Sequence, residues 1–143
     1  MTIGVNFNVA KFKDALQATT TKLQEATRPA AQAGVQIMYD RARALAPVSE
    51  KAHYFHIRGQ KYGPYQPGNL RDSIYQVYAK DRSFADVSTY EVSWNKNKAP
   101  YGYVYEFGNS KRGAKSFIGR AVVETRKDVR AAIKQRFISE VNK

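Results

Sequence analysis

Residues 73–94 read SIYQVYAKDRSFADVSTYEVSW and contain two segments, 73–79 and 89–94, that follow the period-two pattern of side chains in a β-strand. The intervening residues 80–86 are mostly polar, and their number suits a hairpin loop. We therefore expect an antiparallel pair of strands in the middle of the chain.

Two helices are expected before this hairpin, over residues 8–26 and 29–45. Apolar side chains recur at helical spacing in the first, namely Val9, Phe12, Leu16 and Leu23. Thr27 can cap a new helix and Pro29 suits its first turn, so a break is predicted between the two. The second helix carries small or apolar residues on two faces, which predicts that it is sandwiched between other elements. It should end before Pro47, because a residue that precedes proline is disfavoured in the helical region.

The clearest helix is expected over residues 116–141, with Ser116 as its N-cap. Its apolar face is formed by Ile118, Val122, Thr125, Val129, Ala132, Ile133 and Phe137. Residues 101–107 fit either a strand or one to two turns of helix. The order helix, helix, strands, helix predicts a single domain over residues 1–143 with an α+β fold. In this fold a small antiparallel sheet packs with two N-terminal helices and one long C-terminal helix.

Length and composition exclude several classes of protein. The chain of 143 residues and 16.2 kDa is 43% hydrophobic and 25% charged, which excludes wholesale disorder. No apolar run approaches the about 20 residues of a membrane span. The first residues lack the basic and apolar regions of a secretory signal, so no such signal is expected. We also expect no membrane among the partners. The absence of cysteine excludes disulfides, thiolate metal sites and cysteine nucleophiles.

The chain is strongly basic, with 24 Lys and Arg against 12 Asp and Glu and a net charge of +12. Residues 1–50 hold six basic and four acidic residues, a net +2, whereas residues 51–143 hold eighteen and eight, a net +10. This surplus favours contact with phosphate groups or with an acidic protein surface. A basic surface without a polyanionic partner is the alternative.

Residues 48–69 are expected to form an extended, irregular loop rich in aromatic and basic residues. Three glycines and two prolines interrupt six aromatic or imidazole rings, and a loop of this length in a compact domain is usually functional or disordered. The candidate partner-contact residues are Tyr54, Phe55, Ile57, Arg58, Tyr62 and Tyr65. In nucleic-acid-binding proteins, aromatic rings stack on bases and basic side chains contact phosphates. Tyr and Arg are also enriched in protein interfaces, and the composition favours protein contact over nucleic acid.

Residues that carry catalysis are scarce. The chain has no glycine-rich phosphate-binding motif and no nucleophile elbow. His53 and His56 follow Glu50 at spacings of three, but a metal site there would need a rigid helix and a further ligand. We therefore expect no catalytic residues, no metal, no cofactor and no enzymatic activity.

Four phrases occur along the chain in a set order: ALAPV at 44–48, GNLRDSI at 68–74, YGYVYEFG at 101–108 and FIGRA at 117–121. This order resembles the tail-completion and head–tail joining proteins of tailed bacteriophages, the gene-product-ten family of long-tailed lambdoid phages, to which minor tail protein Z is similar. The resemblance spans about residues 10–138, and the ordered set rather than any single phrase makes it specific. Two departures from the family pattern are the long insertion between Val48 and Pro67 and the replacement of a proline by Arg120.

The resemblance implies a structural virion protein in the neck or at the top of a phage tail, present in the host cytoplasm during assembly. It implies an oligomeric ring whose partners are copies of the chain itself and adjacent neck, connector or tail-tube proteins. Passing contact with phage DNA is compatible with this role. The alternative reading is a basic nucleic-acid-binding module.

Glu106 is the acidic residue most expected to be partly buried, because Tyr105 and Phe107 flank it. A buried carboxylate needs a cationic or hydrogen-bonding partner, and Arg71 or Arg120 is the natural candidate. We expect such a pair to be structural and to fix the sheet against the last helix.

Overall fold

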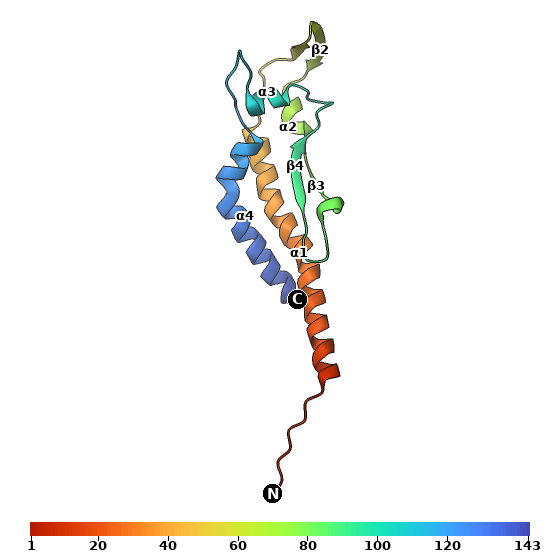
Figure 1. Ribbon diagram of the computed structural model, residues 1–143. Coiled ribbons are helices and arrows are strands. Elements are labelled where there is room, and N and C mark those ends of the chain that lie inside the picture. Colours follow the sequence, from red (N-terminus) through yellow and green to blue (C-terminus); the bar gives the residue numbers. More distant parts are fainter.

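The computed structural model describes residues 1–143 and has the predicted α+β fold (Figure 1). Two long helices lie side by side, and two small antiparallel hairpins accompany them. The elements in chain order are α1 (Val9–Leu45), β1 (His53–Ile57), β2 (Gln60–Tyr65), α2 (Asn69–Ser73), β3 (Ile74–Tyr78), the 3₁₀ turn η1 (Lys80–Arg82), β4 (Tyr90–Trp94), α3 (Gly102–Phe107) and α4 (Ile118–Val141).

One continuous helix, α1, replaces the two N-terminal helices that the sequence predicts. Pro29 lies inside α1, and the adjacent Ala30 is buried. Thr27 does not cap a new helix, because its hydroxyl donates to the Gln24 carbonyl at 2.8 Å and lies 2.9 Å from the Ser88 hydroxyl. Packing on both sides of the proline outweighs the hydrogen bond that the proline removes, so the predicted break is wrong.

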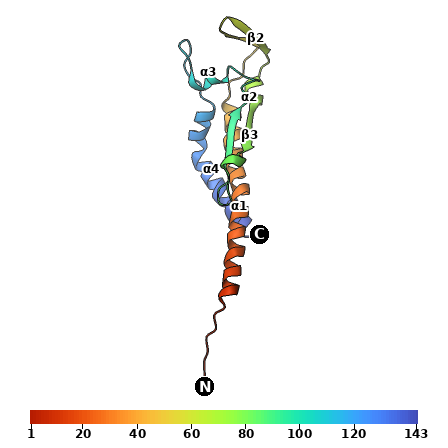
Figure 2. The same cartoon turned by 45° about the vertical axis from the view of Figure 1, so that its right-hand side comes forward.

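The C-terminal half of α1 lies between α4 on one side and the β3–β4 hairpin on the other (Figure 2). Gly34 marks the close contact with α4, where a Cβ atom would lie 2.6 Å from Ile133 Cγ1. On the hairpin side, the Gln76 amide is hydrogen-bonded to Gln32 at 2.9 Å and to Gln36 at 2.7 Å. The predicted sandwich is confirmed.

The β3–β4 hairpin forms where the sequence predicts it. Its register runs from Ile74 opposite Trp94 to Tyr78 opposite Tyr90. Residues 101–107, whose sequence fits either a strand or a short helix, contain helix α3 (Gly102–Phe107). The last helix begins at Ile118, close to its predicted start.

The expectation of an irregular loop over residues 48–69 is wrong, because β1 and β2 form a second antiparallel hairpin there. Its two-residue turn is Arg58-Gly59, with positive φ values of 49° and 78°. Positive φ at both positions is the geometry whose twist matches that of the two flanking strands. The glycine therefore closes a hairpin where the composition indicates only a flexible loop.

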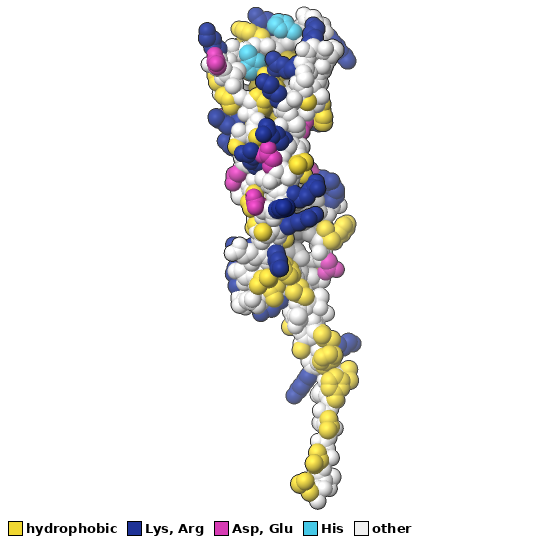
Figure 3. Space-filling model, turned by 90° about the vertical axis from the view of Figure 1, so that its left-hand side faces the viewer, with side chains coloured by type: hydrophobic (Ala, Val, Ile, Leu, Met, Phe, Trp, Pro, Cys, Tyr) yellow, Lys and Arg dark blue, Asp and Glu magenta, His cyan; other side chains and the backbone are white.

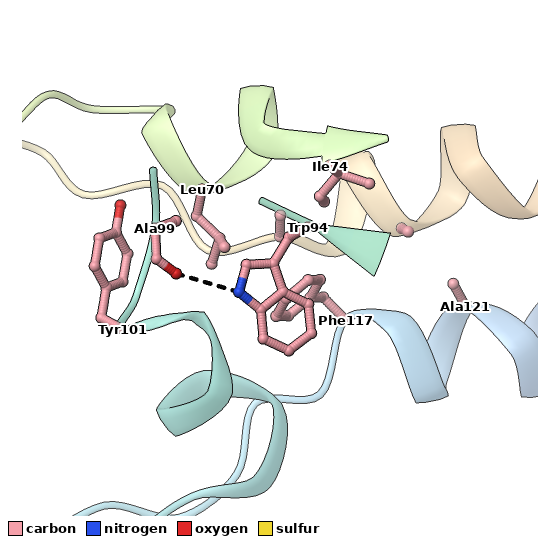
Figure 4. Close-up of a cluster of buried hydrophobic side chains, with 9 residues drawn as sticks. Leu70, Ile74, Trp94, Ala99, Tyr101, Phe117 and Ala121 are labelled. Atoms are coloured by element: carbon pink, nitrogen blue, oxygen red, sulfur yellow. Dashed lines mark hydrogen bonds between the residues drawn. The ribbon is translucent and has the colours of Figure 1, made fainter. Parts of the chain in front are cut away.

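The hydrophobic core lies at one end of the molecule, where α2, α3 and the start of α4 meet the end of α1 (Figure 4). Its members are Ala42, Ala46, Leu70, Ile74, Trp94, Ala99, Tyr101, Phe117 and Ala121. The Trp94 indole packs on the Phe117 ring at 5.4 Å between centroids and donates its N–H to the Ala99 carbonyl at 3.2 Å. Gly102 leaves room for this indole, since a Cβ at residue 102 would collide with it.

The opposite end of the molecule has no core. Every residue from Met1 to Leu23 is exposed, and the first turns of α1 project beyond the end of α4 (Figure 1). Residues 1–8 form an extended arm ahead of α1. None of the helices combines the length and the apolar character that a membrane crossing requires.

Candidate functional site

The β1–β2 hairpin packs on the core through Tyr101. The Tyr101 ring lies 4.7 Å from the His53 ring, 5.9 Å from Phe55 and 4.9 Å from Tyr65, measured between centroids. Its hydroxyl accepts a hydrogen bond from the Asn69 side chain at 3.0 Å. Burial raises the pKa of Tyr101, so its hydroxyl stays neutral at physiological pH. The inner face of the hairpin is therefore part of the fold.

The other candidate contact residues of the hairpin remain accessible. Tyr54 and Tyr62 expose 47% and 42% of their surface, and Arg58 is exposed at the turn. The Lys61 ammonium lies 3.8 Å from the centre of the Tyr54 ring, which is a cation–π contact on the solvent side. Of the six predicted residues, Phe55, Ile57 and Tyr65 are partly buried, whereas Tyr54, Arg58 and Tyr62 are available to a partner.

A cleft of about 500 Å³ separates this hairpin from α3 and the loop after it. It is lined by Ser49, His53, Tyr54, Phe55, Tyr101, Val104, Tyr105, Asn109, Lys111 and Arg112. The Arg112 guanidinium lies 5.0 Å from the centre of the Tyr105 ring, so cations and rings share the cleft. Such a lining suits an acidic or aromatic group of a partner.

Glu106 is buried, as the sequence predicts, but its partners are backbone donors rather than an arginine. Its carboxylate accepts the N–H groups of Phe117 at 2.9 Å, Ile118 at 3.0 Å and Gly119 at 2.8 Å. It also accepts the Ser116 hydroxyl at 2.8 Å. These are free donors at the start of α4, so Glu106 of α3 caps a helix that begins twelve residues later in the chain.

The environment of Glu106 has two opposing effects on its pKa. Burial alone would raise the pKa of this carboxyl, while the hydrogen bonds from Gly119, Phe117, Ile118 and Ser116 lower it. The hydrogen bonds prevail, and the pKa lies below its ordinary value of 4.5. Glu106 is therefore a carboxylate at neutral pH.

The predicted pairing of Glu106 with Arg71 or Arg120 is wrong. Arg71 instead forms a salt bridge with Asp72 at 2.9 Å, and Arg120 forms one with Glu124 at 2.6 Å. Both arginines use acids that are close in sequence. The start of a helix offers several backbone N–H donors to one carboxylate. These hydrogen bonds stabilise a buried carboxylate without a cationic side chain.

Ser116 has a different role from the predicted N-cap. Phe117 occupies the N-cap position and makes no side-chain capping bond. The Ser116 hydroxyl donates to Glu106 and accepts the Arg120 N–H at 3.2 Å. The sequence carries only a weak signal for this arrangement. The signal is an acidic residue between two aromatic residues, ten residues before a serine.

The two histidines do not meet around a ligand. His53 and His56 lie three apart on β1 and therefore on opposite faces, with His53 partly buried and His56 exposed. The Ser49 hydroxyl lies 3.4 Å from His53 Nδ1, and the Nε2 atom of His53 is buried without a hydrogen-bond partner. The structure contains no cluster of three or more His, Asp or Glu side chains that could hold a metal ion.

Comparison with known proteins adds no relative to this picture. No protein-family model, curated protein or solved structure matches the chain. A proposal of function therefore depends on the ordered phrases of the sequence and on the surfaces described above.

Proposed function

We propose that the protein is a structural virion protein of a tailed phage that acts in head–tail joining or tail completion at the neck, as a subunit of an oligomeric ring. Its partners in this proposal are other copies of the chain and adjacent neck, connector or tail-tube proteins. It would be made in the host cytoplasm and end in the virion, without enzymatic activity. The family resemblance supplies the biological role, and the surface of the subunit supports the assembly.

The observation that carries the proposal is the amount of exposed surface. The chain exposes 10365 Å². A compact monomer of this mass is expected to expose about 7,500 Å². The surplus comes from an elongated shape with its core at one end, and it includes large apolar side chains that are more than half exposed, such as Ile3, Val5, Phe7 and Phe12. A chain that leaves so much surface uncovered is suited to bury it against neighbours.

The hairpin end is the surface that we assign to the adjacent virion protein. Tyr54 and Tyr62 are half-exposed rings, and Arg58 lies at the turn between their strands. Rings and arginines of this kind are enriched at the residues that anchor protein interfaces, and the rings bury a large area at a small entropic cost. The cationic cleft beside Tyr54 favours a partner surface with acidic side chains.

Genetic complementation of a phage that lacks this gene tests the role. Replacing the hairpin would damage the fold, because Phe55 and Tyr65 pack on Tyr101. The test therefore uses the double variant Tyr54→Ser with Tyr62→Ser, and the matched control is Tyr75→Ser, since Tyr75 is exposed to the same extent on β3. We expect the double variant to fold normally but to give few infectious particles and no incorporation into tails. Normal titres from the double variant would contradict the proposed contact.

A second candidate function, binding of nucleic acid, is favoured by the outer side of α4. Four basic residues there, Arg126, Lys127, Arg130 and Lys134, are exposed and form no ion pair with an acid. Figure 3, which views the molecule from the α4 side, shows Lys and Arg side chains spread over this face. Gel-shift titration against salt separates the two functions. A nucleic-acid module should still bind DNA at about 150 mM salt with a steep salt dependence, whereas incidental contact is lost there.

A further inference from the structure

The arm ahead of α1 has the sequence pattern of a strand but no partner strand. Ile3, Val5 and Phe7 alternate with Thr2, Gly4 and Asn6, and residues 1–8 contain no charged side chain. The three apolar side chains are 80%, 97% and 66% exposed. An uncharged segment with one apolar face is the kind of peptide that adds to the edge of a sheet.

Val5 and Phe7 of the arm cannot reach the sheet of their own chain. The arm joins α1 at Val9, and the loop of the β3–β4 hairpin is bonded to α1 at Gln24, whose amide donates to Asp86 at 2.9 Å; Gln24 lies about 22 Å from Val9 at 1.5 Å per residue. An apolar groove between β4 and α4 begins near Ala31, about 33 Å from Val9 on the same scale. Extended residues span at most about 3.6 Å each, so Val5, four residues before Val9, stays within about 14 Å of Val9 even when the arm turns straight back. A sheet that accepts the arm therefore belongs to another molecule.

Strand β4 has a free edge that can accept such a strand. It pairs with β3 alone. The Ala79 N–H bonds to the Thr89 carbonyl, and the Asn95 N–H bonds to the Ser73 carbonyl, so the ladder uses the odd-numbered residues of β4. The backbone groups of Tyr90 and Val92 consequently point to the free edge, and a strand added there would place its facing side chains toward α1.

An apolar groove lies along this edge. It has a volume of about 260 Å³ between β4 and α4, with α1 as its floor. Its apolar lining consists of Ala31, Val35, Met38, Tyr90, Val129 and Ile133. A volume of this order holds two or three side chains the size of valine or phenylalanine, which matches one face of the arm.

The apolar stripe on the projecting part of α1 is largely uncovered by its own chain, although the Phe7 ring lies 5.5 Å from the Phe12 ring. Leu16 precedes Gly34 by eighteen residues, five helical turns, and so lies on the side of α1 that faces α4. The end of α4 reaches only to Lys22, whose ammonium lies 3.5 Å from the Val141 carbonyl. Phe12 and Leu16, each 52% exposed, therefore continue the α1–α4 contact surface past the end of α4.

We infer that residues 3–8 of one copy add as a strand to the free edge of β4 in a second copy and insert Val5 and Phe7 into the groove between β4 and α4. The inference rests on the proposed ring and names the contact between its subunits. Copies with a net charge of +12 repel one another, and an arm without charged side chains joins them without adding to that repulsion. The donor and acceptor surfaces differ, so the contact is head-to-tail and can propagate around a ring.

Sedimentation velocity of the full chain over a range of concentrations tests the contact. We expect the native chain to associate, and we expect Val5→Asp and Phe7→Asp each to weaken association at least tenfold, because the new charge would enter an apolar groove. The matched control is Asn6→Asp, which adds the same charge to the opposite face of the strand and should change association by less than twofold. A native chain that stays monomeric up to about 1 mM, or a control as damaged as Phe7→Asp, overturns the inference.

Photo-cross-linking locates the acceptor. A chain with p-benzoylphenylalanine in place of Phe7 is mixed with isotopically heavy chain and irradiated. The expected products join position 7 of one chain to peptides of the other that contain Tyr90 to Val92 or Val129 to Ile133. Cross-links confined to one chain, or to other surfaces of the second, overturn the assignment. If the arm fails these tests while complementation still requires Tyr54 and Tyr62, the proposed function stands and only this contact is lost.

Discussion

A carboxylate on one helix can cap another helix when the connection between them folds back, and Glu106 does this for α4. The three N–H groups that it accepts are the donors that a helix leaves free at its start, and its negative charge also meets the positive end of the helix dipole. Burial of an acid at this position follows from its flanking rings. Its partners do not follow from the sequence, because every helix start offers the same backbone donors and only the tertiary fold decides which one lies nearby.

Replacing Glu106 by Gln should lower the free energy of unfolding by about 1–3 kcal/mol, because the amide loses the charge and turns one donor group toward backbone donors. Urea unfolding at neutral pH measures the effect. Glu25→Gln on the exposed side of α1 is the control and should change stability little. Arg71→Ala and Arg120→Ala should leave the cap intact, so a loss in either that equals the loss in Glu106→Gln would argue for an ion pair instead.

The same cap predicts a pH dependence with a definite sign. The pKa of Glu106 is lower in the folded chain than the ordinary value of 4.5, because the four hydrogen bonds at the start of α4 outweigh the cost of burial. The stability that the Glu106 carboxylate gives to the folded chain is therefore fully present above pH 4.5, and it is lost as the pH falls through the pKa of Glu106 in the folded chain. We expect the stability difference between the native chain and Glu106→Gln to shrink on acidification below that pH. A constant difference from pH 7 into this acidic range would mean that Glu106 does not act as a charged cap.

At the scale of the elements, the sequence predicts a helix or strand correctly where a regular side-chain pattern extends over many residues. The β3–β4 hairpin and α4 belong to this group, because alternating or helical spacing continues over most of each element. It predicts wrongly where a local signal conflicts with packing. Pro29 signals a helix start, but the same helix packs on its neighbours on both sides of that residue. In residues 48–69 the glycines that suggest an irregular loop instead allow a tight turn at Gly59.

Pro29→Ala tests the balance within α1. The alanine restores an N–H that can bond to the Glu25 carbonyl and removes the steric conflict of the ring, so we expect unfolding to cost about 1–3 kcal/mol more than in the native chain. Pro47→Ala, a proline just beyond the C-cap of the same helix, is the control and should give no such gain. Stability that falls in Pro29→Ala would show that the proline ring makes a packing contact worth more than a helical hydrogen bond.

At the scale of the whole molecule, the buried core is concentrated at one end. The buried cluster joins the end of α1 to α2, β4 and α4, and the hairpin that we assign to a neighbouring protein is attached there through Tyr101. The other end is a single helix and an arm with no residue buried before Ala26. A subunit built this way presents its core end, with the hairpin, to the neighbouring protein that we propose and its arm end to the second copy that we propose.

Amide hydrogen exchange along α1 should reveal this division. An isolated helical stretch of this length is marginal in water, and the projecting part has only Asn8 as a cap, through a 3.2 Å bond from the Lys11 N–H. Thr19, Thr20 and Thr21 weaken it further, because β-branched side chains are poor helix formers. In dilute monomer we therefore expect amides 12–22 to exchange nearly as fast as in an unfolded chain, and amides 30–45 to exchange only through global unfolding. Protection that rises at 12–22 with concentration would show the stripe being covered by a second copy, whereas uniform protection of α1 in the dilute monomer would mean that the projecting part is already held by its own chain.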